Sequence, residues 1–395
     1  YNMQLSMYAQ YMKDFNDAHH LNIMAGYEWQ KFHEKSDWYG TGYYQSEYLV
    51  PDYNRPYNMP SEDAITKYKT ENYLVSFFGR LNYSLLDRYL VTFTIRDDGS
   101  SRFHKDNRWG IFPSVALAWK INEEPFMKKL TSVSDMKLRL GWGITGQQNV
   151  GGSAGDYYYL DTFAPNKDHA YYPLFGDGTT ARPDATNKEL TWEKTTTWNA
   201  GLDLGFLNNR LTFSLDWYYR KTKDLINTVY VEAGSTFRNK LTSNIGSLHN
   251  TGLEFTTTVR PVQTRDWSWE VSYNLTYNKN EIDELNVGGG NTTVPTGGVS
   301  AGTGGYIQAH ATGHPASAFY VYQQVYDENG RPIQNAFVDR NGNGTIDSGD
   351  KYFYYKPEAD VLMGLSSRLT YKNFDFGFSM RASLGNYVYN DNEAG

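Results

Sequence analysis

The chain has 395 residues, no cysteine, a net charge of −7 and a mean hydropathy of −0.65. This composition excludes disulfides, a thiol nucleophile and cysteine-ligated metals, and the negative charge argues against nucleic acid as the main partner. No apolar stretch approaches the length that a transmembrane helix needs. Strands of a transmembrane β-barrel stay compatible with the low hydropathy, because lipid-facing and lumen-facing residues alternate along them.

Aromatic residues are unusually frequent, with 34 Tyr, 20 Phe and 10 Trp, whereas hydrophobic residues of all kinds make up only 39%. A soluble core of this size would rely on Leu, Ile and Val instead. Tyr and Trp are favoured where hydrocarbon meets water, because one end of the side chain is apolar and the other forms hydrogen bonds. The composition therefore favours a protein that meets a membrane interface.

In chain order, strict alternation of apolar and polar residues recurs many times, as expected of β-strands. In residues 267–278, for example, Trp, Val, Tyr and Leu occupy one face and Ser, Glu, Asn and Thr the other. The alternating segments are residues 73–83, 89–96, 136–144, 192–206, 210–220, 253–260, 267–278 and 374–384. Many reach about ten residues, the length that crosses a bilayer at a tilt. Aromatic residues gather near strand ends, which is typical of an aromatic girdle.

The connections between these strands fall into a short and a long set. The short set is 16–20, 86–88, 122–135, 207–209, 261–266 and 372–373, and the segment 122–135 is expected to contain one helical turn. The long set is 36–69, 97–107, 147–189, 223–246 and 281–360. In the second of these we expect Asp97, Asp98 and Gly99 to form a turn. Outer-membrane barrels have short periplasmic turns and long extracellular loops, so the long set is predicted to face outside.

This count gives roughly twelve strands, whereas plugged outer-membrane transporters close with about 22. No linker or composition shift marks a domain boundary within residues 1–395. The sequence therefore predicts an all-β fold, a transmembrane antiparallel β-barrel present in part. A soluble sandwich or propeller is disfavoured, because neither a spacing of about 8–12 residues between strands nor a repeat of fixed period is present.

One motif within residues 281–360 has the spacing of a calcium loop. Residues 339–350 match a twelve-position loop whose oxygen ligands come from alternate positions and whose sharp turn is a glycine, here Gly344. The candidate ligands are Asp339, Asn341, Asn343, the Thr345 carbonyl, Asp347 and Asp350. Two features depart from the pattern: Asp350 is shorter than the usual Glu, and no helices are expected on either side. A structural calcium and an ion-free Asn/Gly-rich turn both stay open.

No catalytic arrangement is found. The eight histidines lack metal-site spacing, and neither a G-x-S-x-G elbow nor a phosphate-binding glycine loop occurs in a strand-to-helix setting. The acidic residues Glu193, Asp203, Asp216, Glu254 and Glu270 lie on the polar faces of predicted strands. A barrel wall needs solvated or plug-contacting groups there, so we expect no enzyme.

Several short motifs in order along the chain resemble the C-terminal barrel half of SusC-like TonB-dependent transporters. From about Tyr73 onward they include R-D-D-G-S-S-R-F from Arg96, N-R-W-G from Asn107, F-P-S from Phe112, N-E-E-P-F from Asn122, T-G-Q-Q-N from Thr145, W-E from Trp192, G-L-D from Gly201, N-N-R from Asn208, N-I-G from Asn244, Y-N-K-N-E from Tyr277 and Y-K-N-F from Tyr371. Each motif is weak alone, and together they are specific.

The resemblance implies a plugged barrel in the outer membrane of a Bacteroidetes-type bacterium. It further implies import of oligosaccharides or peptides with TonB energy, and a SusD-like surface lipoprotein over the opening. The family's signal peptide, TonB box, plug and closing strands are not found here, and the chain starts at Tyr1 without an initiator Met. We therefore expect an internal fragment of a longer protein that reaches TonB through its N-terminal region.

Substrate contact is expected from aromatic clusters in the long connections. Flat aromatic faces suit stacking on sugar rings, although they would also cover loops against the partner lipoprotein. The candidates are Trp38, Tyr39, Tyr157, Tyr158, Tyr159, Tyr171 and Tyr172.

Two other functions stay open as alternatives. A passive porin or structural barrel would lack a plug, and an outer-membrane barrel hydrolase would need a positioned Ser/His or Asp/His set. The sequence does not choose between glycan and peptide substrates, nor does it settle whether two transporters form a homodimer in the bilayer.

Overall fold

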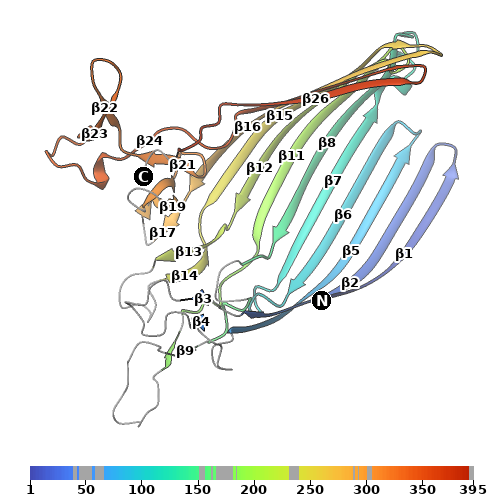
Figure 1. The fold of residues 1–395 in the computed structure, drawn as a ribbon. Helices are drawn as coiled ribbons and strands as arrows, with labels where there is room; N and C mark the ends of the chain where they lie inside the picture. Colours follow the sequence, from blue (N-terminus) through green and yellow to red (C-terminus); the bar gives the residue numbers. More distant parts are fainter. Residues whose placement is uncertain are drawn as a thin grey trace.

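The computed structural model describes residues 1–38, 42–43, 56–57, 66–150, 156–161, 163–165, 181–183, 185–230, 240–287, 290–291, 293–299 and 305–390. Twelve strands form one antiparallel sheet in which every strand pairs with its neighbours in the chain (Figure 1). They are β1 (Asn2–Asn16), β2 (His19–Trp38), β5 (Thr66–Leu85), β6 (Tyr89–Ser100), β7 (Trp109–Lys120), β8 (Val133–Gln147), β11 (Glu193–Phe206), β12 (Leu211–Lys223), β15 (Ser247–Gln263), β16 (Trp267–Glu284), β25 (Val361–Tyr371) and β26 (Phe374–Leu384). The predicted all-β antiparallel wall of about twelve strands is confirmed.

The sheet curves into a tilted wall, as Figure 1 shows. Its strands are 11 to 20 residues long, well beyond the five or six residues common in soluble sheets. The edge strands β1 and β26 are exposed at every residue, because each pairs on one side only within the described chain. Among the described residues, no helix has the length and apolar character of a membrane span.

The two faces of the sheet differ in chemistry because successive side chains along a strand point to opposite sides. One face carries exposed aromatic and aliphatic residues. Phe77 on β5 is 53% exposed and stacks on Trp109 of β7, with ring centroids 6.2 Å apart. Trp217 on β12 is 45% exposed on the same kind of surface. The opposite face carries Ser, Thr, Asn and paired charges. This is the alternation that the sequence predicts for a barrel wall.

Tight turns join the strands at one end of the wall. The turns after β5 and β11 use backbone with positive φ at Asp87, Asn208 and Asn209, residue types that tolerate this region. The expected helical turn after β7 is present as η2 (Ile121–Glu123). Just beyond it, the Glu124 carboxylate accepts hydrogen bonds from Tyr89 (2.5 Å) and from the Trp119 indole (3.0 Å). These contacts hold in place the start of the connection 122–135, which is the longest of the short connections.

The long connections gather at the opposite end, along the left side of Figure 1 from β22 and β23 at the top to β9 at the bottom. Small sheets form within them: β3 (Gly42–Tyr43) with β4 (Pro56–Tyr57), β9 (Phe163–Pro165) with β10 (Ala181–Pro183), β13 (Ile226–Tyr230) with β14 (Lys240–Asn244), β17 (Asn286–Val287) with β18 (Gly290–Asn291), and β22 (Gln324–Tyr326) with β23 (Pro332–Phe337). A four-stranded sheet combines β19 (Val294–Gly298), β20 (Tyr306–His310), β21 (Ala318–Val321) and β24 (Tyr352–Phe353).

The turn expected at Asp97, Asp98 and Gly99 is wrong. These residues continue β6 to Ser100, and Asp98 pairs with Gly110 of β7. The Asp98 carboxylate accepts a hydrogen bond from Arg96 (2.6 Å), so its charge is satisfied along the strand and it does not need to cap a turn. The connection is therefore confined to residues 101–108.

Two small hydrophobic cores hold the long connections together. The first consists of Phe103, Phe112, Val150, Leu190 and Trp192, with Phe103 fully buried. The second consists of Val229, Ile245, Ile282 and Leu285. Each core joins residues from at least two connections, so the described parts of these loops pack against each other.

Candidate functional site

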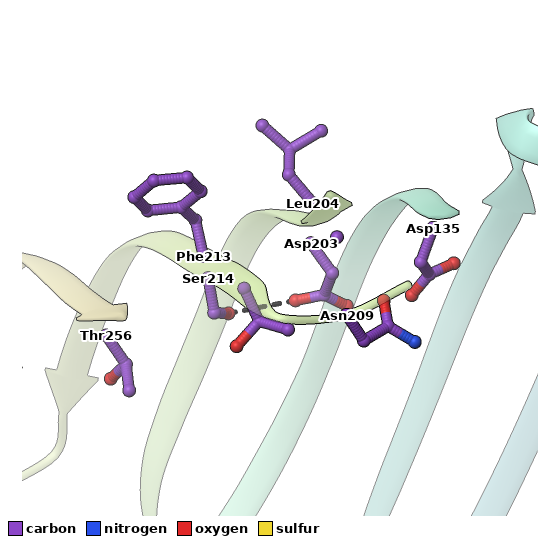
Figure 2. A pocket seen from close by; sticks show the side chains of 9 residues that line it. Asp135, Asp203, Leu204, Asn209, Phe213, Ser214 and Thr256 are labelled. Carbon is purple, nitrogen blue, oxygen red and sulfur yellow. Dashed lines mark hydrogen bonds between the residues drawn. The ribbon is translucent and has the colours of Figure 1, made fainter. Parts of the chain in front are cut away.

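An arginine joins three strands on the polar face near the tight-turn end. Arg139 on β8 donates to both oxygens of Asp203 on β11 (2.8 and 2.9 Å) and also pairs with Asp216 on β12 (2.8 Å). Ser214 donates to Asp203 (2.8 Å), the contact drawn in Figure 2. A Cβ at Gly201 would lie 2.4 Å from Asp216 Oδ1, so only glycine leaves room for this cluster. One arginine thus bridges two carboxylates and offsets part of their negative charge.

A shallow hollow of about 350 Å³ lies beside this cluster (Figure 2). Asp203 and Ser214 line it together with Asp135, Asn209 and Thr256. The carboxylate and hydroxyl oxygens and the Asn209 amide of this lining can accept and donate hydrogen bonds on the lumen side of the wall. The residues that line the hollow include no histidine and no cysteine.

A second charge cluster lies on the same polar face towards the long-connection end. The Arg96 guanidinium donates to Glu28 on β2 (3.0 Å), Ser76 on β5 (2.7 Å) and Asp98 on β6 (2.6 Å). Glu28, Ser76 and Asp98 are all buried. A third set, Arg260 with Glu270 and Arg368 with Asp375, joins β15, β16, β25 and β26. Cross-strand ion pairs of this kind fix the register of the wall.

Of the predicted acidic residues, Asp203, Asp216 and Glu270 are thus engaged in ion pairs. Glu193 accepts a hydrogen bond from the backbone N–H of Ile226 (3.1 Å). Glu254 is exposed on the polar face. Its backbone lies opposite that of Asp216 on the neighbouring strand. These placements agree with a solvated or plug-contacting wall.

The calcium-type loop 339–350 folds as one compact turn. The Asp339 carboxylate accepts from the backbone N–H groups of Gly342 and Gly344 (2.7 Å each), and Asn343 Oδ1 accepts from Thr345 N–H (2.8 Å). Gly342 and Gly344 have φ of +72° and +79°, which glycine adopts without strain. The side-chain oxygens of Asp339 and Asn343 therefore already point into the loop.

The last position of the loop is fully buried. The Asp350 carboxylate accepts from the backbone N–H groups of Asp347, Arg340 and Asn341 (2.8, 2.8 and 3.2 Å). These hydrogen bonds, that from Asp347 first, hold the pKa of the Asp350 carboxyl below its ordinary value. Within the described residues, no three His, Asp or Glu side chains group closely enough to hold a metal ion by themselves. Amide and carbonyl oxygens would therefore have to complete any calcium shell here.

The predicted substrate aromatics fall into two groups. Tyr39, Tyr171 and Tyr172 lie outside the described residues, and Trp38 ends β2 with a side chain that is likewise not described. Tyr157 and Tyr159 are half-buried, and their hydroxyls donate to the backbone carbonyls of Glu71 and Ser101 respectively.

Tyr158 packs against the core around Phe103 and Trp192. The preceding Asp156 accepts from Thr70 and Asn72 (2.7 and 2.8 Å) and pairs with Arg102 (3.1 Å). The segment 156–161 is thus anchored to β5 and to the connection after β6, and its tyrosines contribute to that anchoring. Direct ligand contact by these three residues stays a prediction.

The whole described wall matches a known barrel family. A family model for the TonB dependent receptor-like β-barrel matches residues 4–390. The chain belongs to this family. Members are outer-membrane proteins, so the apolar face of this TonB-dependent receptor barrel meets lipid and its polar face lines the lumen.

Named relatives of this barrel cover nearly all of the chain. It is 55% identical over 397 residues to TonB-dependent receptor SusC of Bacteroides thetaiotaomicron, covering 99% of this chain and 38% of the relative. It is 32% identical over 407 residues to TonB-dependent receptor P26 of Formosa agariphila, covering 96% and 39%. The resemblance to SusC-like barrels is confirmed, and the chain spans about two fifths of the length of these relatives.

Solved structures share the fold. The RagAB peptide importer in its open-open state superposes with a TM-score of 0.79 at 23% identity, covering 98% of this chain and 40% of that chain. The structure of the RagAB peptide transporter gives a TM-score of 0.76 at 22% identity, covering 97% and 41%. At these identities the likeness shows that the wall of this TonB-dependent receptor barrel has the same architecture.

The barrel carries one aromatic group that the sequence analysis missed. Tyr355, at the end of the four-stranded sheet, stacks on Tyr387, which follows β26, with ring centroids 3.7 Å apart and planes 3° apart. Phe353 stacks on His314 at 3.8 Å. The signal was present as the run Tyr352 to Tyr355, but the distance in sequence to His314 and Tyr387 hid the cluster.

Proposed function

We propose that this chain forms part of the barrel of a TonB-dependent importer that takes up oligosaccharides or peptides across the outer membrane. The observation that carries the proposal is the match of residues 4–390 to the receptor barrel family, together with 55% identity to SusC. The RagAB proteins, which share the fold, are described as peptide transporters or importers. Both the short and the long connections have the lengths that this orientation in the outer membrane requires.

In this proposal the polar face contacts a plug that moves when TonB pulls on the N-terminal region of the full-length protein. The cluster of Arg139, Asp203 and Asp216 offers a stiff surface for a plug to rest on, because its charges are paired and its side chains are fixed by several hydrogen bonds. A wall of unpaired flexible charges would have to be reordered each time the plug moved. The paired clusters avoid this entropic cost.

A SusD-like lipoprotein would lie over the end where the long connections gather. The two hydrophobic cores give these connections a defined shape. A partner that covers the opening needs such a defined surface to bind. The relatives and structures compared are named receptors, transporters or importers, and we propose that this barrel likewise catalyses no reaction.

The test is to purify the native full-length protein from outer membranes in mild detergent and to measure its intact mass with everything that co-purifies. A chain far heavier than 45.3 kDa with a bound surface lipoprotein supports the importer. A chain of this size alone, conducting ions openly in a planar bilayer, supports a passive pore and overturns the proposal. Native mass spectrometry of the same sample shows whether two copies form a homodimer.

We also propose that the loop 339–350 binds one structural calcium ion. Asp339, Asn341, Asn343, the Thr345 carbonyl, Asp347 and Asp350 would hold it, and the fit rests on the loop's inward-pointing side-chain oxygens and two glycines with positive φ. A bound hard cation would stiffen the connection before β24.

Calorimetric titration of the full-length protein with calcium should give one site that Asp339→Ala abolishes and that Asp327→Ala leaves intact. Asp327 is a suitable control because its carboxylate caps a separate turn between β22 and β23, accepting from Asn329 and Arg331 N–H (2.8 Å each). Absence of binding at millimolar calcium would leave an ion-free turn.

A further inference from the structure

The aromatic group at the base of the longest connection encloses a hollow of about 290 Å³. We call it the aromatic hollow and define it by His314, Phe353, Tyr354, Tyr355, Asp360 and Tyr387. We propose that the aromatic hollow is a binding subsite for one sugar ring of an oligosaccharide. The proposal rests on the importer function above and narrows the substrate class at this position to carbohydrate.

The aromatic rings of the hollow are both rigid and accessible. Tyr355 and Tyr387 are each 41% exposed although they stack in parallel, and the edge of Tyr354 meets Tyr355 with centroids 4.1 Å apart. Backbone hydrogen bonds hold the two segments together: Tyr387 N–H donates to the Lys356 carbonyl (3.1 Å), and Asp360 N–H donates to the Leu384 carbonyl (2.9 Å). A preformed aromatic surface loses little entropy when a ligand binds.

A polar pair stands beside the aromatic rings. Lys356 Nζ contacts Asp360 Oδ1 at 2.8 Å, and the Lys356 side chain is only 13% exposed whereas that of Asp360 is 46% exposed. Gly385 has φ +82°, and a Cβ there would lie 2.6 Å from Asp360 Oδ2. The glycine therefore lets the carboxylate lie close to the chain. A carboxylate with a free edge accepts hydrogen bonds from neighbouring hydroxyl groups, which sugars supply in adjacent pairs.

The phenol groups add donors that stay protonated. A hydrogen bond with Tyr355 raises the pKa of Tyr387, and partial desolvation beside Tyr355 raises the pKa of Tyr354. Both hydroxyls are therefore neutral at physiological pH and can donate as well as accept. Apolar ring faces combined with neutral donors and one carboxylate suit a polyhydroxylated ring better than a charged or purely apolar ligand.

The surface of the hollow is made by side chains. Tyr354 N–H donates to the Phe319 carbonyl (3.0 Å) and Phe319 N–H donates to the Tyr355 carbonyl (2.7 Å), so these backbone groups are used in joining β21 to the segment after β24. The groups that can recognise a ligand by stacking and by hydrogen bonds to hydroxyls are the tyrosine rings and the Asp360 carboxylate.

The aromatic hollow is small. Its volume of about 290 Å³ lies just below the range of about 300–1,000 Å³ typical of sites for drug-sized molecules, so it has room for a single ring. A neighbouring hollow of about 320 Å³ also has Tyr387 in its lining, together with Phe319 and Tyr389. A chain of linked rings could therefore continue past Tyr387.

The experiment uses the full-length transporter with its bound lipoprotein, labelled and applied to an array of neutral hexose oligosaccharides and to an array of random heptapeptides. We expect glycan binding, with the affinity for the bound oligosaccharide weakened about five- to tenfold in Tyr387→Ala and in Tyr355→Ala, as loss of one aromatic contact predicts. Tyr387→Phe should keep the affinity within about twofold, because the ring face remains.

The matched control is Trp217→Ala. Trp217 is 45% exposed on the apolar face of β12 and lines neither hollow. Its loss should leave the affinity unchanged. Heat-modifiable migration on gels verifies that each variant is folded.

Binding of heptapeptides with no glycan binding overturns the proposal, and so does glycan binding that is equal in wild type, Tyr387→Ala and Tyr355→Ala. Neither result touches the importer function, which the co-purified lipoprotein and intact mass test separately. A passive pore without lipoprotein would instead overturn the importer itself.

Discussion

The phenol of Tyr218 on β12 fills the space above Gly252 on β15, the residue with which it pairs across the sheet. A Cβ at Gly252 would lie 2.4 Å from the Tyr218 hydroxyl oxygen and 2.5 Å from Cζ, and the hydroxyl donates to Asn278 Oδ1 on β16 (3.0 Å). One glycine thus allows a tyrosine to lie across the lumen wall and join three strands.

Gly252→Val is therefore expected to lower the stability of the barrel by about 1–3 kcal/mol, because the added side chain displaces Tyr218 and breaks its hydrogen bond. The measurement is the temperature at which detergent-solubilised full-length protein loses its heat-modifiable gel shift. Gly79→Ala is the control, since a Cβ there meets nothing closer than Ile95 Cγ2 at 3.7 Å. Equal transition temperatures for Gly252→Val and Gly79→Ala would contradict the prediction.

Arg139→Met should destabilise the wall because it leaves Asp203 and Asp216 facing each other without a counter-charge. These side chains are 27–29% exposed, so solvent reduces the penalty, and we expect about 1–3 kcal/mol and not the larger cost of a fully buried pair. The same gel-shift assay measures it. Adding Asp203→Asn to Arg139→Met should recover part of the loss, and no recovery would show that the arginine acts through packing alone.

The loop 339–350 should lose its order in acid because of Asp350. The pKa of this buried carboxyl is lower in the folded protein than in the unfolded chain, so its contribution is fully present above the ordinary aspartate value of about 3.9 and is lost as pH falls through the lower folded value. Hydrogen exchange of the Arg340, Asn341 and Asp347 amides should accordingly be protected at pH 5–7.

Asp350→Asn should remove much of that protection at neutral pH, because an amide oxygen accepts more weakly than a carboxylate and its second group is a donor. Asp327→Asn, in a separate turn, should leave these three amides protected. If Asp350→Asn exchanged like wild type at pH 7, the carboxylate would not be what orders the loop.

Trp192→Ala should loosen the long connections while leaving the membrane wall intact. Trp192 is only 3% exposed, contacts Phe103 and Phe112 with ring centroids 5.3 Å away, and donates to the Arg108 carbonyl (2.9 Å). Truncation of such a residue costs about 3–5 kcal/mol locally.

Protease added to whole cells should then cut the connections after β6 and β8 faster in Trp192→Ala than in wild type. The gel shift of the barrel should remain. Trp109→Ala, which removes a tryptophan 48% exposed on the lipid face, should not change the cleavage rate.

The alternation of residues and the short connections between the alternating segments predicted most of the strands and their antiparallel order, and the aromatic residues near strand ends indicated the membrane setting. Residues 267–278 and 374–384 illustrate this, since both lie within strands β16 and β26. The segments forming β1, β7 and β25 alternate less clearly, yet the pairing of their neighbours makes them strands.

Only the tertiary structure decided which polar residues meet. Arg139, Asp203 and Asp216 are up to 77 residues apart in sequence and are brought together by the register of three strands. Asp97, Asp98 and Gly99 resemble a turn by composition, but strand pairing and the Arg96 contact keep them extended. The stack of Tyr355 on Tyr387 depends on backbone contacts between the end of the longest connection and the segment after β26, and local propensity contains no information about such contacts.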